Sequence, residues 1–404
     1  MLTAISALAE RAAAALIERN ALYERFFAGE AKHLAQACRE MSERFLHGGR
    51  LVAFGRGPYT TDAQHVSVEF VHPVIVGKRA LPALDISALL RPWLDVIVRA
   101  PDIVMGFGPP EGDPEIERAL QSVAARGVMT LALPGREPSG IQTSRAASYC
   151  FEAVTGDPFQ HQEMVEILYH TLWETVHVFF ERQGVGQDAG EAAFLYPFLG
   201  REQQETAGVA EEVAASIRMK VEDDARLRAQ VANDQAETIA SAVVAIGERL
   251  RRGGKLILFG NGGSATDAND WAFDCILPAK GRKPIPAISL SLEPAIATAL
   301  ANDVGTEVIF LRQLIAHGRP EDIAVGISTS GGSRNIVMAL EEARKRGLLT
   351  IGLLGYDGGE VVRRGLADRA LVVHSDYIPR IQEVQASIYH VITELLSERA
   401  YGEN

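Results

Sequence analysis

The sequence repeats itself, and this duplication constrains the fold more than any other feature. Residues 48–69 and 253–274 share nine of 22 identical positions at a constant offset of 205. Further along, residues 119–135 and 339–355 share seven of 17 identical positions at an offset of 220. Two matches in the same order indicate two copies of one structural unit.

Each copy has the same order of expected elements. A long helical region leads into a short apolar strand, a glycine turn and a helix; two more strand–helix units and a closing helix follow. Strands that are apolar throughout and alternate with helices predict a parallel sheet covered by helices on both faces. We therefore expect an α/β fold with two tandem three-layer α/β/α domains. These are residues 1–185 and 209–404, each preceded by long N-terminal helices and joined by a linker at 186–208.

Length, charge and cysteine content narrow the class of protein. A chain of 404 residues suits two domains, and its net charge of −12 argues against nucleic-acid and anionic membrane partners. Its three cysteines, Cys38, Cys150 and Cys275, are far apart and have no CxxC spacing, which favours a reduced, cytoplasmic compartment. No apolar run approaches the length of about 18 residues that a membrane span needs.

Two loops of the second copy suit a phosphate. GNGGS at 260–264 follows the strand LILF, STSGGS at 328–333 follows the strand DIAVGI, and each loop opens a helix. Helix N-termini offer unpaired N–H groups, glycines let the backbone approach a ligand closely, and hydroxyl groups add donors. Either loop alone would equally be an ordinary turn. Together, at the ends of neighbouring parallel strands, they predict one shared anion site.

The second copy resembles the sugar isomerase (SIS) domain family and, within it, the phosphoheptose isomerases. Four segments carry this resemblance: FGNGGSATDA, GISTSGGSRNI, TIGLLGYDGG and RIQEVQASIYH. The resemblance covers nearly all of residues 210–404 and, more faintly, residues 5–180. It implies a flavodoxin-like SIS fold in each copy and the activity of a sugar-phosphate aldose–ketose isomerase. It further implies that a phosphorylated sugar is bound by Asn261, Gly262, Gly263, Ser264, Asp303, Ser328, Thr329, Ser330, Ser333 and Gln382.

The corresponding loops of the first copy are altered. GRGPY at 55–59 replaces GNGGS, and GPPEGD at 108–113 replaces STSGGS. The two prolines of the second loop remove N–H donors, and Glu111 and Asp113 would repel a phosphate. We therefore expect no phosphate at these loops.

The first copy keeps residues of another kind. His65 and Glu69, at positions i and i+4, share one face of an expected helix and are close enough to share a metal or a proton path, although such a pair is often an ordinary surface interaction. The resemblance implies that His65, Glu69, Gln162 and His170 bind zinc. His161, beside Gln162, is a further candidate for this site.

The resemblance also implies which residues catalyse proton transfer. Glu69 is the expected base, and His170 or His390 is the expected acid. In the second copy, Asp270 and Asp274 stand where the first copy has His65 and Glu69, so an unchanged zinc site is not expected there.

The two copies thus keep complementary parts of one expected site. Because active sites of this family lie at interfaces between subunits, we predict composite sites: the second copy holds the phosphate and the first copy supplies acid–base groups. A homodimer would then provide four SIS domains. Two alternatives remain open, a non-catalytic regulator that binds sugar phosphates and a protein-interaction module.

Overall fold

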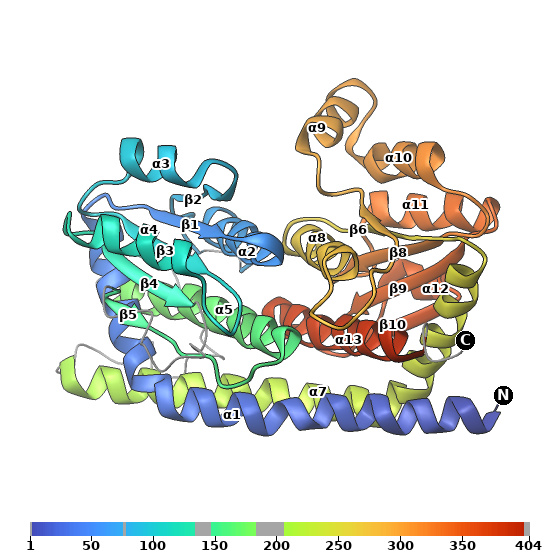
Figure 1. Ribbon diagram of the computed structural model, residues 1–404, viewed down its shortest axis with the longest axis horizontal. Coiled ribbons are helices and arrows are strands. Elements are labelled where there is room, and N and C mark those ends of the chain that lie inside the picture. Colours follow the sequence, from blue (N-terminus) through green and yellow to red (C-terminus); the bar gives the residue numbers. More distant parts are fainter. Residues whose placement is uncertain (1, 76–77, 134–146, 183–205, 400–404) are drawn as a thin grey trace. The chain divides into compact units, whose positions relative to one another are not determined.

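The structure is a computed structural model that describes residues 2–75, 78–133, 147–182 and 206–399 (Figure 1). It divides into two compact units. One contains Ala21–Asp223, and the other contains Met1–Asn20 together with Asp224–Asn404. The predicted linker at 186–208 lies outside the described residues except for positions 206–208, which open a helix.

The unit Ala21–Asp223 contains a sheet of five parallel strands in the order β2-β1-β3-β4-β5. The strands are β1 Leu51–Gly55, β2 Ala83–Asp85, β3 Ile103–Phe107, β4 Met129–Leu133 and β5 Tyr149–Cys150. The helical elements of this half of the chain are α1 Leu2–Leu46, η1 Gly57–Tyr59, α2 Thr60–Val71, η2 Ser87–Leu89, α3 Leu90–Ile97, α4 Pro114–Ala124 and α5 Pro158–Arg182.

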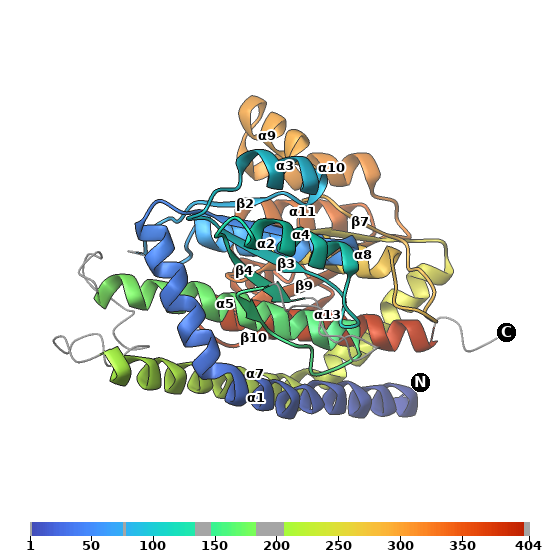
Figure 2. The ribbon, with the colours of Figure 1, turned by 60° about the vertical axis from the view of Figure 1, so that its left-hand side comes forward.

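Helices cover both faces of this sheet because alternate strand residues face opposite sides. Leu51 and Met105 pack into an apolar core with residues of α1, α2 and α5. Val52 and Val104 pack on the other face against α3 and α4. The layers can be followed in Figure 2, which shows α4 and α5 on opposite sides of β3 and β4.

The second unit repeats this plan with the strand order β10-β9-β8-β6-β7, again all parallel. Its strands are β6 Leu256–Phe259, β7 Ala287–Ser289, β8 Ile323–Ser328, β9 Leu349–Gly355 and β10 Arg369–Val373. Its helical elements are α7 Thr206–Arg251, α8 Gly263–Ile276, α9 Pro294–Asp303, η3 Thr306–Val308, α10 Ile309–His317, α11 Arg334–Lys345, α12 Gly359–Arg363 and α13 Ile378–Arg399. Leu256 and Ile351 belong to one apolar core, and Ile257 and Ala324 belong to the core on the other face.

Both sheets follow the flavodoxin-like order, in which the first strand lies between the second and the third. The predicted parallel three-layer fold is therefore confirmed. Each sheet also has two strands that the sequence did not predict, β2 and β5 in one and β7 and β10 in the other. Three of these four contain only two or three residues, too few to give an apolar run.

The compact units differ from the predicted domains in their helices. Leu8 and Leu16 of α1 are buried in the core of the unit that contains the second copy. Val213 and Ile217 of α7 are buried in the core of the unit that contains the first copy. The apolar stripe of a long helix shows that one face is buried, but not which core buries it. None of the described helices has an apolar stretch long enough to cross a membrane.

Candidate functional site

The loop after β8 is shaped to present donors at the start of α11. The Ser328 hydroxyl accepts a hydrogen bond from the Gly331 N–H at 3.1 Å and lies 3.3 Å from the Ser333 hydroxyl. Gly331 has a φ of +59°, and a Cβ there would lie 2.2 Å from the carbonyl oxygen of Gly358. Gly358, in the segment TIGLLGYDGG, therefore packs against this loop, and only glycine fits at position 331.

The loop after β6 leads directly into α8. Gly262 has a φ of +57°, and α8 begins at Gly263. Ser264 is buried in the first turn of this helix. Because β6 and β8 are neighbours at the point where the strand order reverses, both loops leave the same edge of the sheet beside each other.

The predicted sugar-phosphate residues occupy three places in this unit. The loop residues Asn261 to Ser264 and Ser328 to Ser333 lie together at the carboxyl edge of the sheet. Gln382 is buried on α13, whereas Asp303 is exposed at the C-terminal end of α9. The Asp303 carboxylate accepts a hydrogen bond from the Asn302 side chain at 2.8 Å.

A cluster of titratable side chains lies further along α8. Asp270 and Asp274, one helical turn apart, face His390 of α13, and all three are buried. The His390 Nε2 atom lies 3.0 Å from the Asp274 Oδ2 atom and 3.7 Å from the Asp270 Oδ2 atom. The Tyr389 hydroxyl donates to Asp270 at 2.6 Å. These contacts stabilise buried charge, which would otherwise be costly.

The charge of this cluster acts on its neighbours. Burial and then the charges of Asp274 and Asp270 raise the pKa of the Cys275 thiol well above its usual value. From Gly263 to Asp270, α8 rises by about 10 Å. One helix thus connects the glycine- and serine-rich loop after β6 to the buried cluster of Asp270, Asp274 and His390.

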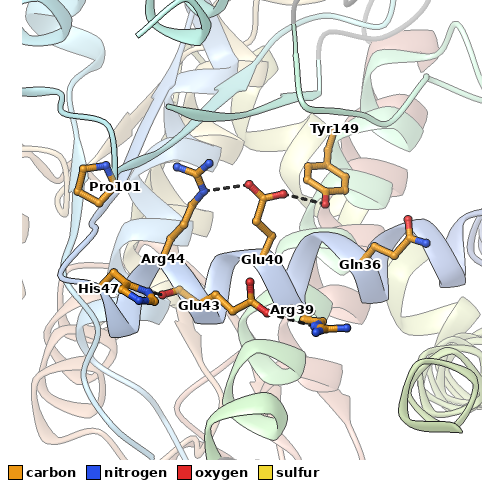
Figure 3. A pocket seen from close by; sticks show the side chains of 8 residues that line it. All are labelled: Gln36, Arg39, Glu40, Glu43, Arg44, His47, Pro101 and Tyr149. Atoms are coloured by element: carbon orange, nitrogen blue, oxygen red, sulfur yellow. Dashed lines mark hydrogen bonds and ion pairs between the residues drawn. The ribbon is translucent and has the colours of Figure 1, made fainter. Parts of the chain in front are cut away.

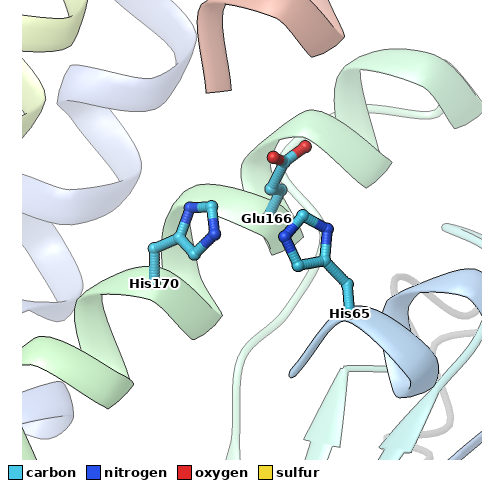
Figure 4. Close-up of side chains that lie close together, drawn as sticks. All are labelled: His65, Glu166 and His170. Atoms are coloured by element: carbon cyan, nitrogen blue, oxygen red, sulfur yellow. The ribbon is translucent and has the colours of Figure 1, made fainter. Parts of the chain in front are cut away.

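The first copy has a cluster at the equivalent positions. His65 of α2 lies with Glu166 and His170 of α5, and ligand atoms of the three side chains are all within 4.8 Å of one another (Figure 4). Glu69 adds a second carboxylate, 3.8 Å from the His65 Nε2 atom. All four side chains are buried. Two imidazoles and two carboxylates are a donor set that zinc accepts.

Glu166 is a member that the sequence analysis missed. Gln162, Glu166 and His170 stand at i, i+4 and i+8, so they lie along one face of α5. This spacing was the available signal, but the second copy has Ala386 at the equivalent position, so the comparison of the copies did not draw attention to it. The Gln162 amide lies 3.4 Å from the Thr61 hydroxyl and 3.4 Å from the Asp62 carboxylate.

Side chains of the first copy make ion pairs and hydrogen bonds within its altered loops. Arg56 pairs with Asp113 at 2.7 Å, and Asp113 caps the start of α4 by accepting from the Glu115 N–H at 2.7 Å. Behind them, the His161 Nε2 atom bonds the Gly108 carbonyl at 3.1 Å. Burial lowers the pKa of His161 to about 4, so this side chain is neutral near pH 7. His161 therefore supports the altered loop.

A separate cavity of about 600 Å³ is lined by the C-terminal part of α1 together with Pro101 and Tyr149 (Figure 3). Its charged side chains are paired with one another: Arg44 with Glu40 at 2.9 Å, and Arg39 with Glu43 at 3.1 Å. The Tyr149 hydroxyl donates to Glu40 at 3.0 Å. These contacts show no chemistry beyond structural pairing.

Known proteins with similar sequences match the second copy of this chain. The SIS domain family model matches residues 221–355. The phosphoheptose isomerase of Leptospira biflexa is 38% identical over 189 residues, which are 46% of this chain and 96% of that protein. The phosphoheptose isomerase of Chlorobaculum parvum is 45% identical over 176 residues, which are 43% of this chain and 83% of that protein.

Several solved structures match both copies. One of them is the C-terminal domain of glucosamine-fructose-6-phosphate aminotransferase from Francisella tularensis, with a TM-score of 0.60 and 10% identity. The match covers 93% of this chain and 94% of that one. At this identity the similarity shows a shared fold. The relatives with closer sequences match just under half of the chain.

Proposed function

Because this chain belongs to the SIS domain family and is homologous to the phosphoheptose isomerases, we propose that it interconverts an aldose and a ketose phosphate, and that sedoheptulose 7-phosphate is its substrate. The observation that carries the proposal is the geometry of α8. This helix begins at the serine- and glycine-rich loops and places Asp270 and Asp274 against His390. The phosphate is held at the loops, and the reacting carbons extend toward the cluster.

The reaction is a proton transfer between neighbouring carbons. A base removes a proton from the carbinol carbon beside the ketone while an acid protonates the carbonyl oxygen, giving an enediol. A proton then returns to the former carbonyl carbon as the neighbouring hydroxyl loses its own, and the aldose results. We assign the base to Asp274 and the acid to His390, because their 3.0 Å contact couples the two proton positions. Asp270, held by Tyr389, stabilises the positive charge on His390.

We further propose that the first copy binds zinc through His65, Glu69, Glu166 and His170. Four protein ligands fill a tetrahedral site, which is the arrangement of structural zinc, and a bound ion would offset the charge of two buried carboxylates. Metal analysis of the full chain and of the Glu166→Gln variant tests this. We expect about one zinc per chain in the parent and a loss of zinc and of thermal stability in the variant. An equal metal content in both proteins would remove Glu166 from the site.

The composite site remains a prediction. It requires Glu69 and His170 to act on a sugar that the second copy holds, and the retention of both residues in a copy with altered loops supports it. Turnover separates the two arrangements. If the site is composite, the Glu69→Gln variant loses kcat. If Glu69 is a structural zinc ligand, the variant loses zinc and stability, and kcat changes less. The predicted homodimer is checked by sedimentation of the full chain.

The experiment for the proposed function compares sedoheptulose 7-phosphate with unphosphorylated sedoheptulose. We expect aldose formation from the phosphorylated sugar alone, because the loops hold the phosphate away from the reacting carbons. Tight binding without aldose formation would favour the regulator. The absence of both binding and turnover would reject the sugar-phosphate assignment.

A further inference from the structure

The two loops of the second copy are joined by a pair of asparagines. The Asn335 amide donates to the Asn261 Oδ1 atom at 2.9 Å, and the Asn261 amide donates to the Asn335 Oδ1 atom at 3.0 Å. Asn261 belongs to the loop before α8, and Asn335 belongs to the first turn of α11. The pair therefore fixes the distance between the two helix N-termini. It does so without a net charge.

The first copy has a pair at the same two positions, with different chemistry. Arg56 takes the place of Asn261, and Glu115 takes the place of Asn335. The Arg56 guanidinium lies 3.2 Å from the Glu115 carboxylate. The link between the loops is thus present in both copies, but in the first copy it is an ion pair.

A third position changes together with this pair. Asp113 stands where the second copy has Ser333, and its carboxylate accepts hydrogen bonds from the N–H groups of Glu115 and Ile116 at the start of α4. Arg56 neutralises that carboxylate at 2.7 Å. In the second copy, the Ser333 side chain makes no such cap on α11. The first copy therefore carries a carboxylate at this helix start, whereas in the second copy the Ile336 N–H donates to the neutral Asn335 side chain at 2.9 Å.

We propose that the residue pair at positions 261 and 335 determines which copy accepts a phosphate, and that Asn335 is a positioning residue for the isomerase reaction. A neutral amide pair holds the loops at the spacing that a phosphate needs and adds no competing charge. In the first copy the arginine of the pair also binds Asp113, whose carboxylate occupies the start of α4. This inference rests on the proposed binding of a sugar phosphate by the second copy.

The test measures binding of sedoheptulose 7-phosphate and of inorganic phosphate to the full chain by calorimetry, together with steady-state kinetics. Asn335→Ala removes the link without adding charge. We expect Kd and KM to rise by about fivefold with little change in kcat, since about one net hydrogen-bond energy is lost. The double variant N261R/N335E transfers the ion pair of the first copy. It restores the link and adds a carboxylate whose arginine partner is engaged in the ion pair, so we expect a loss of affinity of more than about tenfold at an unchanged melting temperature.

The matched control is R56N/E115N, which places the amide pair in the first copy and should leave the affinity of the second copy's site unchanged. Wild-type affinity in both Asn335→Ala and N261R/N335E would overturn the proposal while the proposed function stands. If the parent protein binds neither ligand, the proposed function fails and this inference fails with it. A kcat that falls as much as KM rises in Asn335→Ala would show a role in catalysis and contradict positioning.

Discussion

The two copies share a sheet order and a loop-to-loop link, but they carry different side chains at the linked positions. In the second copy, serines and glycines stand at two helix starts, and Asp270 and Asp274 lie further along one of these helices, against His390. In the first copy, Asp113 and Arg56 occupy the corresponding helix start. Its buried cluster includes Glu166, where the second copy has Ala386. The difference teaches that two copies of one fold can carry either an internal ion pair or neutral side chains at the same helix start.

Substitution of the equivalent histidines, His170 and His390, should show the largest difference between the two copies. His390→Asn removes the proposed acid, and we expect kcat to fall by about 10²–10⁴-fold. His170→Asn removes a proposed zinc ligand, so zinc content and melting temperature should fall while kcat falls far less. Turnover of sedoheptulose 7-phosphate and metal analysis on the same preparations check both expectations. Equal losses of kcat would favour the composite site.

His161 should make the stability of the first copy depend on pH. The second copy has Ile381 at the equivalent position, which cannot titrate. The folded-state pKa of His161, about 4, lies below the ordinary value of 6.5, so the unfolded chain binds the proton more readily. Stability is therefore complete above pH 6.5 and is lost as the pH falls toward 4, by about 3 kcal/mol at most. Urea unfolding at several pH values measures this.

His161→Gln keeps a neutral donor for the Gly108 carbonyl and should remove most of this pH dependence. The exposed His72, changed to Gln, is the control and should leave the slope as it is. A His161→Gln protein with the parent's slope between pH 6.5 and 4 would show that other groups cause the acid sensitivity.

A shared structural feature should respond alike in both copies. The Asp102 carboxylate accepts from the Arg50 N–H at 3.0 Å and the Arg99 N–H at 2.9 Å. Asp322 accepts from the Lys255 N–H at 3.0 Å and the Arg319 N–H at 2.9 Å. Both carboxylates are buried at the start of a strand.

We expect Asp102→Asn and Asp322→Asn each to lower the free energy of unfolding by about 1–3 kcal/mol, because each leaves a backbone donor without its acceptor. Hydrogen exchange of the adjacent strands resolves the two copies separately. A large effect in one copy and none in the other would mean that the shared framework has also diverged.

Much of this architecture could be predicted from the residues alone. The apolar strands LVAF and LILF, each followed by a glycine turn, indicated the parallel sheets. The absence of phosphate at GPPEGD, inferred from its prolines, stays a prediction. These are local signals, because each depends on the backbone chemistry of a few neighbouring residues. The short strands β2, β5 and β7 carry no such signal. Each has only two or three residues, and these form a strand because they pair with a neighbouring strand of the sheet.

The remaining features depend on packing between distant segments. Glu166 joins His65 because α5 packs against α2, and no pattern within either helix states that contact. The Asn261–Asn335 link joins residues 74 positions apart. The exchange of helix segments between the compact units depends on which core buries each part of α1 and α7, and a stripe of apolar residues leaves that choice open.

The most direct test of the account is the number of sugar-phosphate molecules that one chain binds. Calorimetry of the full chain with sedoheptulose 7-phosphate should give one site per chain. That site should disappear in Ser333→Asp, which gives α11 the internal carboxylate of the first copy, and persist in Asp113→Ser. Two sites per chain, or a single site that survives Ser333→Asp, would contradict the assignment of the ligand to the second copy.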